Sequence, residues 1–411
     1  IIHILDYKSC TFDYNPEVLL QYVDLPRIFQ KFISESDYIQ DQLHTDGSVI
    51  YKQIDDTNRF NVSTFCNYLD ENKDITVLAC NIDIFKDCYI IPNSYFSHIC
   101  KKYSNIKFIV SSDETFMKYG KEEYSHKNVF YIANSILNPY SFVKNTNTLN
   151  NFASYYIIND YLQEDYVNFL QKLYYTSNDV VRDKKYNFYN GVHKPHRLKC
   201  YELIKKYDLL NEGYFSYADF AYQSKNEELD QEFMQFFGFK KKEEYIKYLS
   251  TFEIPLHYDT KESDPNVFVA FANPPQTSLQ SYVSITTETT FQVGARTGDM
   301  VLSEKAFKSF YGFNIPLIIG TPIGIQYLKD LGFDLFEDLF DVSPPQTQKD
   351  VFKQLEKNLQ TIKSKSKLEL HDYYINNMDR LASNFELLTR ILRERDLENL
   401  NNFFQRCTKN I

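Results

Sequence analysis

The segment VLSEKAFKSFYGFNIPLIIGTPIG, residues 301–324, contains in quick succession the patterns of a helix, a strand and a second helix. Ser303 is a favourable N-cap for the first helix. The apolar strand of residues 316–319 leads almost directly to Thr321 and Pro322, which suit the N-cap and first position of the second helix. A strand that runs straight into a helix is typical of an α/β fold.

The same alternation extends in both directions along the chain. Apolar runs rich in β-branched and aromatic residues predict strands, and longer amphipathic stretches between them predict helices. This spacing favours parallel sheets covered by helices on both faces. The predicted strands occupy residues 74–85, 106–112, 128–135, 184–191, 213–220, 266–272 and 281–291, and the predicted helices include 95–104, 195–210 and 224–250.

The order of these elements predicts two Rossmann-like α/β domains and a helical tail. We expect an N-terminal domain over residues 1–177, a second domain over 178–345, and the tail over 346–411. Two sheets facing each other would leave a cleft, and ligands of open α/β sheets bind at the carboxyl ends of the strands. The helix of residues 195–210 is expected to begin at Pro195 and to stop before Gly213.

Composition and charge restrict the function classes. The 411-residue chain has a formal net charge of −10, which weighs against a protein that coats nucleic acid. Its seven cysteines are scattered without a Cys-x-x-Cys pair, so neither a disulfide framework nor a zinc knuckle is expected. The sequence predicts no transmembrane segment, and the expected location is the cytoplasm. The chain begins with Ile1, so a targeting segment upstream stays an open alternative.

The triplet Ser303, Glu304 and Lys305 opens a predicted helix. A cation in the first turn meets the positive end of the helix dipole, at a cost of about 0.3–1 kcal/mol. A bound phosphate or diphosphate would remove that cost, because it would interact with Lys305 and with the free N–H groups together. Glu304 could then accept hydrogen bonds from the hydroxyl pair of a ribose. The alternative is a capped helix whose lysine points into water.

Three further positions near strand ends are candidates for ligand contacts. Gly320 and Thr321 lie where a strand meets a helix, and form either a binding loop or an ordinary well-made turn. No Gly-Lys-Ser/Thr loop and no Gly-x-Gly-x-x-Gly fingerprint is present. Glu288 stands between threonines at the end of a predicted strand, where it could bind a sugar or simply face water.

Four basic side chains, His193, Lys194, His196 and Arg197, gather around the start of the predicted helix 195–210. Such a group at a helix N-terminus is unfavourable unless an anion binds there. Arg197 could form two parallel hydrogen bonds with a phosphate. The two histidines lack a nearby carboxylate or a third histidine at ligand spacing, so we do not expect a metal.

In combination, these segments resemble the donor-binding half of fucosyltransferase-like glycosyltransferases of the GT-B type. The resemblance covers residues 184–345 and consists of a strand ending in Glu, a Ser/Thr-Glu-Lys triplet opening a helix, and a strand with Pro and Gly at its ends. The stretches NGVHKPHRLKCYELIKKYDLLNEGYFSY, residues 190–217, and GTPIGIQYLKDLGFDLFEDLFD, residues 320–341, are similar to the corresponding parts of bacterial and viral members.

The resemblance implies specific roles. In the family, the Glu of the triplet binds the ribose and the Lys binds the diphosphate, which correspond to Glu304 and Lys305. The phosphate-binding Arg that opens a helix corresponds most nearly to Arg197. The family has Glu-Asn-Ser where this chain has Glu288-Thr289-Thr290, so the sugar contact of Glu288 departs from the family pattern. The intervening segment is also longer here and contains Gly294, Ala295 and Arg296.

The function expected from this resemblance is transfer of a sugar from a nucleotide-sugar donor, with a GDP-sugar favoured, to a glycan or lipid-linked acceptor. The reaction would be inverting, with no metal or other cofactor and with a carboxylate as general base. Candidates for that base are Asp113, Glu114 and Asp83, which follow predicted strands of the N-terminal domain. Three alternatives stay open: a transferase of CMP-linked keto-acids such as Kdo, a binding protein without catalysis, and an epimerase-like enzyme of two domains.

Overall fold

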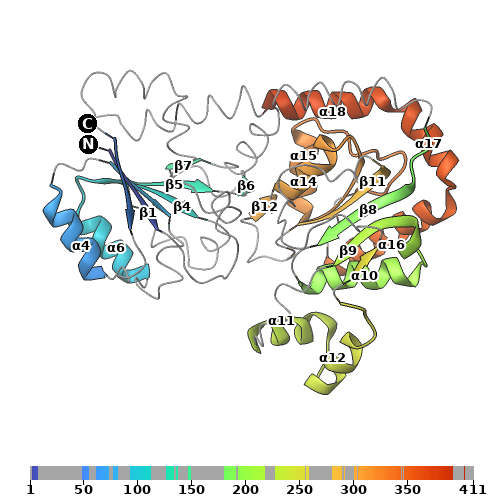
Figure 1. Ribbon diagram of the computed structural model, residues 1–411, viewed down its shortest axis with the longest axis horizontal. Coiled ribbons are helices and arrows are strands. Elements are labelled where there is room, and N and C mark those ends of the chain that lie inside the picture. The colour runs from blue at the N-terminus through green and yellow to red at the C-terminus, as the bar shows by residue number, and fades with distance from the viewer. Residues whose placement is uncertain are drawn as a thin grey trace. The chain divides into compact units, whose positions relative to one another are not determined.

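The computed structural model divides the chain into two compact units (Figure 1). The first comprises Ile1–Asn159 with Gly298–Val301 and Arg390–Ile411, and the second comprises Asp160–Thr297 with Leu302–Thr389. The structure describes residues 2–7, 49–54, 62–73, 77–81, 93–112, 126–133, 136–137, 147–149, 180–190, 193–217, 227–254, 256–258, 280–288, 291, 300–302, 304–343, 345, 347–391 and 402.

The first unit contains a six-stranded sheet in the order β2-β1-β3-β4-β5-β7, and every neighbouring pair in it is parallel. The order reverses between β1 and β3, as in doubly wound folds. Strands β3, β4 and β5 and helix α6 confirm predicted elements, whereas strands β1, β2 and β7 were not predicted. The elements are β1 (Ile2–Tyr7), β2 (Val49–Ile54), α4 (Val62–Glu71), β3 (Val77–Asn81), α6 (Asn93–Lys102), β4 (Lys107–Ser112), β5 (Val129–Ala133) and β7 (Asn147–Leu149).

The second unit contains a five-stranded sheet in the order β10-β9-β8-β11-β13. All neighbours are parallel except β10, which pairs with β9 in the antiparallel sense. The strands are β8 (Lys184–Asn190), β9 (Gly213–Tyr217), β10 (Leu256–Tyr258), β11 (Ser281–Thr287) and β13 (Ile315–Ile319). The prediction of a mixed α/β chain with parallel sheets is therefore confirmed. A separate two-stranded sheet pairs β6 (Ile136–Leu137) with β12 (Met300–Leu302).

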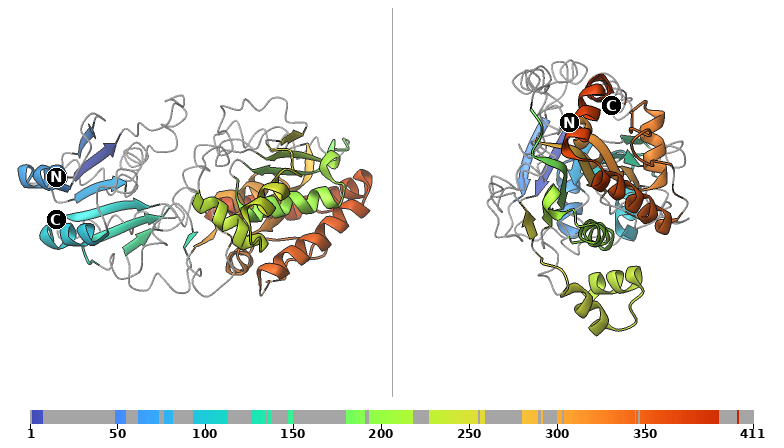
Figure 2. Two further views of the ribbon diagram at one scale, coloured as in Figure 1. Left: turned by 90° about the horizontal axis from the view of Figure 1, so that it is seen from below. Right: turned by 90° about the vertical axis from the view of Figure 1, so that its right-hand side faces the viewer.

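Helices cover both faces of the second sheet. Figure 1 shows α10 and α16 on one side and α14 and α15 on the other, while Figure 2 shows the α11–α12 pair beside these layers. None of the described helices is long and apolar enough to cross a membrane. The helices are α10 (Pro195–Lys206), α11 (Glu227–Phe237), α12 (Lys242–Leu249), α14 (Glu304–Tyr311), α15 (Pro322–Asp330), α16 (Gln348–Ser364), α17 (Lys367–Asn376) and α18 (Met378–Arg390).

The C-terminal helices α16 to α18 pack into the same core as the sheet. Leu359 of α16, Tyr374 of α17 and Leu381 of α18 are buried members of that core. At the amino ends of the strands, Arg182 donates hydrogen bonds to the carbonyl of Ser281 and to the hydroxyl of Tyr374. The Tyr374 hydroxyl in turn donates to the carbonyl of Phe313 at 2.9 Å, so α17 is fixed to the start of three strands.

Helix α10 shows one correct and one wrong prediction. Pro195 occupies the first turn as expected, but the helix ends at Lys206, and Asp208 takes the left-handed conformation with φ of 54°. Gly213 therefore does not end the helix. It pairs with Tyr186 across β8 and β9, and a Cβ atom at Gly213 would lie 2.2 Å from the Tyr186 ring. Gly213 is required because the ring occupies that space.

Replacing Gly213 with Ala is expected to destabilise the second unit by about 3 kcal/mol, because the Tyr186 ring cannot move away without loss. Tyr186 is fully buried and its hydroxyl donates to the carbonyl of Leu209 at 3.0 Å. Urea denaturation of Gly213→Ala in the wild-type and Tyr186→Leu backgrounds forms a double-mutant cycle. The substitution should cost much less once the ring is absent; equal costs in the two backgrounds would contradict this account.

Candidate functional site

The second sheet reverses its strand order between β8 and β11. From β8, the chain passes through α10 to β9 on one side; from β11, it passes through α14 to β13 on the other. Chains that leave two neighbouring parallel strands in opposite directions create a crevice at the carboxyl ends of those strands, and ligands of open α/β sheets bind there. The carboxyl ends of β8 and β11 are therefore where a ligand site is expected.

Two polar side chains meet at this position. Thr287, the last residue of β11, donates a hydrogen bond from Oγ1 to Oδ1 of Asn190, the last residue of β8, at 2.6 Å. Both side chains are buried, and among the described residues Nδ2 of Asn190 has no hydrogen-bond partner. Sequence reasoning missed both residues, although each is a polar residue within a predicted strand.

His196 links the start of α10 to the end of β11. Its Nε2 lies 2.9 Å from the carbonyl oxygen of Glu288. A carbonyl only accepts, so Nε2 carries the hydrogen in this contact. The ring also stacks on Phe291, with centroids 5.1 Å apart and an interplanar angle of 18°. Burial and the neighbouring Arg197 charge hold the pKa of His196 well below its usual value, so the ring is neutral.

His193 has a different environment, formed by aromatic rings. Its ring stacks on Phe233 of α11 at 4.3 Å, and its Nδ1 lies 3.1 Å from the hydroxyl of Tyr217 at the end of β9. Burial raises the pKa of Tyr217, so this hydroxyl stays protonated. The described residues contain no group of three or more His, Cys, Asp or Glu side chains that could hold a metal ion.

Arg197 lies in the first turn of α10 and is only 3% exposed. Its charge influences the pKa of both His196 and Tyr217, so the guanidinium lies near these two side chains. Because His196 is neutral, the expected cluster of four cations at this helix start loses at least one member. The permanent charges there are those of Arg197 and the half-buried Lys194.

Glu288 follows β11 directly and is 1% exposed. Its backbone N–H donates to the carbonyl of Ile319 at 2.9 Å, so the pairing of β11 with β13 continues one residue beyond the strand. Gly320 lies alongside, and a Cβ atom there would be 3.1 Å from Cγ of Glu288. The alternative of an exposed carboxylate on an edge strand is therefore wrong, because β11 is an inner strand and Glu288 is buried.

The other predicted donor residues lie at two helix starts on the β13 side. Thr321 caps α15 by accepting a hydrogen bond from the N–H of Gly324 at 3.2 Å, which confirms its predicted capping role. Helix α14 begins at Glu304, of which the backbone is described, and Lys305 is half-buried. Ser303 lies outside the described residues.

The three acids proposed as general base cannot be placed, because Asp83, Asp113 and Glu114 lie outside the described residues. The strands before them are described: β3 ends at Asn81 and β4 ends at Ser112, which immediately precedes Asp113. The two strands are parallel neighbours, so their carboxyl ends lie at the same edge of the first sheet.

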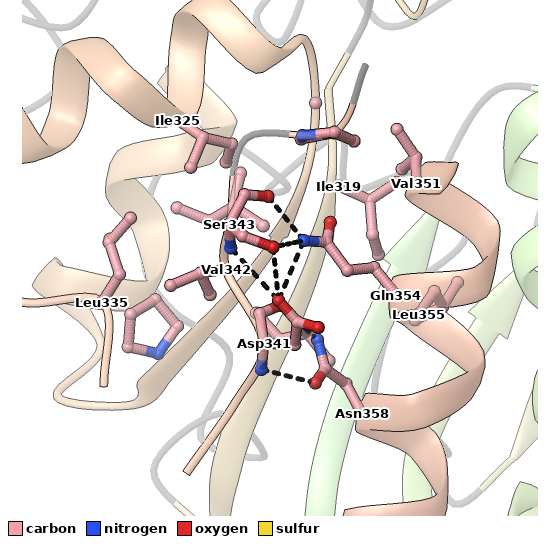
Figure 3. A pocket seen from close by; sticks show the side chains of 15 residues that line it. Ile319, Ile325, Leu335, Asp341, Val342, Ser343, Val351, Gln354, Leu355 and Asn358 are labelled. Atoms are coloured by element: carbon pink, nitrogen blue, oxygen red, sulfur yellow. Dashed lines mark hydrogen bonds between the residues drawn. The ribbon is translucent and has the colours of Figure 1, made fainter. Parts of the chain in front are cut away.

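A cavity of about 30 Å³ lies next to Gly320, between β13, α15 and α16 (Figure 3). Such a volume holds about one water molecule and is too small for a nucleotide ring. The cavity borders on polar contacts that join α16 to the segment before it: Asn358 accepts from the N–H of Asp341 at 2.8 Å and donates to its carbonyl at 2.9 Å. Hydrogen bonds from Ser343, Lys357 and Gln354 lower the pKa of Asp341. This cluster fixes α16 in place.

No protein-family model, curated protein or solved structure matches this chain.

The neutral state of His196 predicts how stability depends on pH. The pKa of His196 is depressed in the folded chain, so unfolding takes up a proton below about pH 6.5, and the free energy of unfolding falls by about 1.4 kcal/mol per pH unit for that proton. We expect His196→Gln to flatten this fall between pH 6.5 and 5. Denaturant titrations at several pH values measure it.

The control for this pH measurement is His98→Gln, which replaces an exposed histidine on α6. This variant tests whether a change in pH dependence belongs to His196 or accompanies any replacement of a histidine by glutamine. Equal pH dependence in His196→Gln and wild type would show that His196 is protonated in the folded chain as readily as in the unfolded one.

Proposed function

We propose that the chain is a glycosyltransferase that binds a nucleotide-sugar donor at the carboxyl edge of the second sheet, with a GDP-sugar favoured. The observation that carries the proposal is the gathering of buried polar side chains where the strand order reverses. Asn190, Arg197, Thr287 and Glu288 come from three separate segments, and each is nearly inaccessible to solvent. Burial of polar groups is costly, so such a concentration at a ligand-binding position supports a functional site.

The donor phosphates bind Arg197 and Lys305. Arg197 lies in the first turn of α10 and Lys305 in the first turn of α14, so each side chain adds its charge to the positive end of a helix dipole. An anion at these starts would be stabilised by the side chains and the free N–H groups together. In the bond-breaking step, the same groups stabilise the charge that develops on the leaving diphosphate, and no metal is needed for this.

The sugar contacts Glu288, and the ribose contacts Glu304. A buried carboxylate is an acceptor that can recognise paired hydroxyl groups, and Glu288 lies between α10 and Gly320 at the reversal point. In the inverting reaction, a carboxylate that acts as general base removes the proton of the acceptor hydroxyl. The acceptor oxygen then bonds to the anomeric carbon as the bond to the phosphate oxygen breaks. The acceptor is a glycan or a lipid-linked saccharide.

Nucleotides should stabilise the protein against heat. A ligand at about 100 times its Kd adds about 2.7 kcal/mol, which raises Tm by several degrees. We expect the largest rise with GDP in a panel of GDP, UDP, CMP and TDP, measured by differential scanning fluorimetry. Lys305→Met should weaken GDP binding about tenfold to a hundredfold, because it removes a charged hydrogen-bond donor.

Lys308→Met is the matched control for this experiment, because Lys308 is also half-buried on α14 but lies in its last turn. It should bind GDP as wild type does. A largest shift with CMP would favour the transferase of CMP-linked keto-acids, and binding without any sugar transfer would favour a non-catalytic protein. If no nucleotide shifts Tm, the donor site does not exist.

The general base is expected among Asp113, Glu114 and Asp83. The amide substitutions Asp113→Asn, Glu114→Gln and Asp83→Asn keep the size of each side chain and remove its basicity. For the residue that acts as base, kcat should fall about 10²- to 10⁴-fold with the donor Kd unchanged. Release of nucleoside diphosphate in the presence of acceptor measures kcat. Wild-type turnover in all three variants would place the base elsewhere.

A further inference from the structure

The peptide group of Glu288 is held from both sides. Its N–H donates to Ile319 of β13 at 2.9 Å, and its carbonyl accepts from Nε2 of His196 in α10 at 2.9 Å. The His196 contact bridges the two strands that separate at the reversal point, because α10 follows β8 and Glu288 follows β11. Both residues are almost completely buried, so neither hydrogen bond competes with solvent.

Stacking fixes the orientation of the His196 ring. Phe291 lies nearly parallel to it at 5.1 Å, three residues beyond Glu288. One imidazole therefore holds the segment after β11 at two points, by a hydrogen bond to the backbone and by ring contact. The ring contact fixes the orientation of the imidazole whose Nε2 holds the Glu288 carbonyl.

Gly320 determines the space that the Glu288 side chain occupies. A Cβ atom on residue 320 would lie 3.1 Å from Cγ and 3.7 Å from Cβ of Glu288. Even an alanine would displace the carboxylate-bearing side chain by a few tenths of an ångström. Helix α10 thus holds the backbone of Glu288 through His196, and Gly320 of the β13–α15 connection borders the methylene groups of its side chain.

We propose that His196 is a positioning residue, and that together with Gly320 it holds the Glu288 carboxylate where the hydroxyl groups of the donor sugar bind. This inference rests on the proposed function and identifies the residues that position its sugar-binding carboxylate. The nucleotide binds through other residues, so the contribution of the sugar can be measured separately, as the ratio of the Kd for GDP to the Kd for the GDP-sugar.

Three variants test the inference by calorimetric titration with GDP and with GDP-fucose or GDP-mannose. His196→Leu removes the N–H donor, and Gly320→Ala crowds Glu288 while leaving His196 intact. In both, the affinity ratio should fall about tenfold, the loss expected for a displaced charged hydrogen bond, while the Kd for GDP changes less than about twofold. His196→Gln retains an N–H that can reach the Glu288 carbonyl, and should restore most of the ratio.

The outcomes separate the two proposals. If wild-type protein binds GDP and the GDP-sugar, but the ratio is unchanged in both His196→Leu and Gly320→Ala, the positioning role is overturned and the donor site stands. Equal weakening of GDP and GDP-sugar in these variants would also overturn it, because a general structural defect lowers both affinities. If wild type binds neither ligand, the proposed function falls, and the role of Glu288 falls with it.

Discussion

The hydrogen bond from Thr287 to Asn190 joins β8 and β11 at the point where the chain leaves them in opposite directions. Buried polar groups are tolerated when they are hydrogen-bonded, and this bond provides partners for the Thr287 hydroxyl and for Oδ1 of Asn190. In a similar way, the hydrogen bond from His196 to the Glu288 carbonyl joins α10 to the end of β11. The reversal of the sheet thus brings buried polar groups together at the carboxyl ends of β8 and β11, where the candidate residue Glu288 also lies.

Local signals in the sequence predicted the helix starts of the second unit well. Pro195 and Thr321 act within one turn of their own helices, so their roles depend on few other residues. Many strands of the two sheets were predictable for the same reason, although β1, β2 and β7 were not. Asp208 and Gly213 show the limit: the left-handed residue lies at the aspartate, and the glycine is needed for Tyr186 of the neighbouring strand. That requirement is tertiary and leaves no local pattern.

The sequence indicated which segments carry the candidate site, but it did not indicate which of their residues contact one another. Arg197 and Glu288 stood out because charged residues are unusual at such positions, and the fold brings both near the reversal point. The contact of His196 with Glu288 spans 92 positions, and no rule of spacing connects them. Sequence reasoning grouped His196 with the cations, whereas burial keeps it neutral and gives it a backbone partner. Burial changes the chemistry of a side chain, and only the fold determines burial.

Arg182 and Tyr374 are 192 positions apart in the chain, yet their contact closes the amino end of the second sheet. A ribosome that adds 5–20 residues per second needs about 10–40 s to make that stretch. Until α16 and α17 have been made, the apolar face that they later cover has no partner from its own chain. During translation, this unit must therefore wait in an unfinished state, open to association with other nascent chains, and chaperones that shield apolar surface should affect its yield more than its final stability.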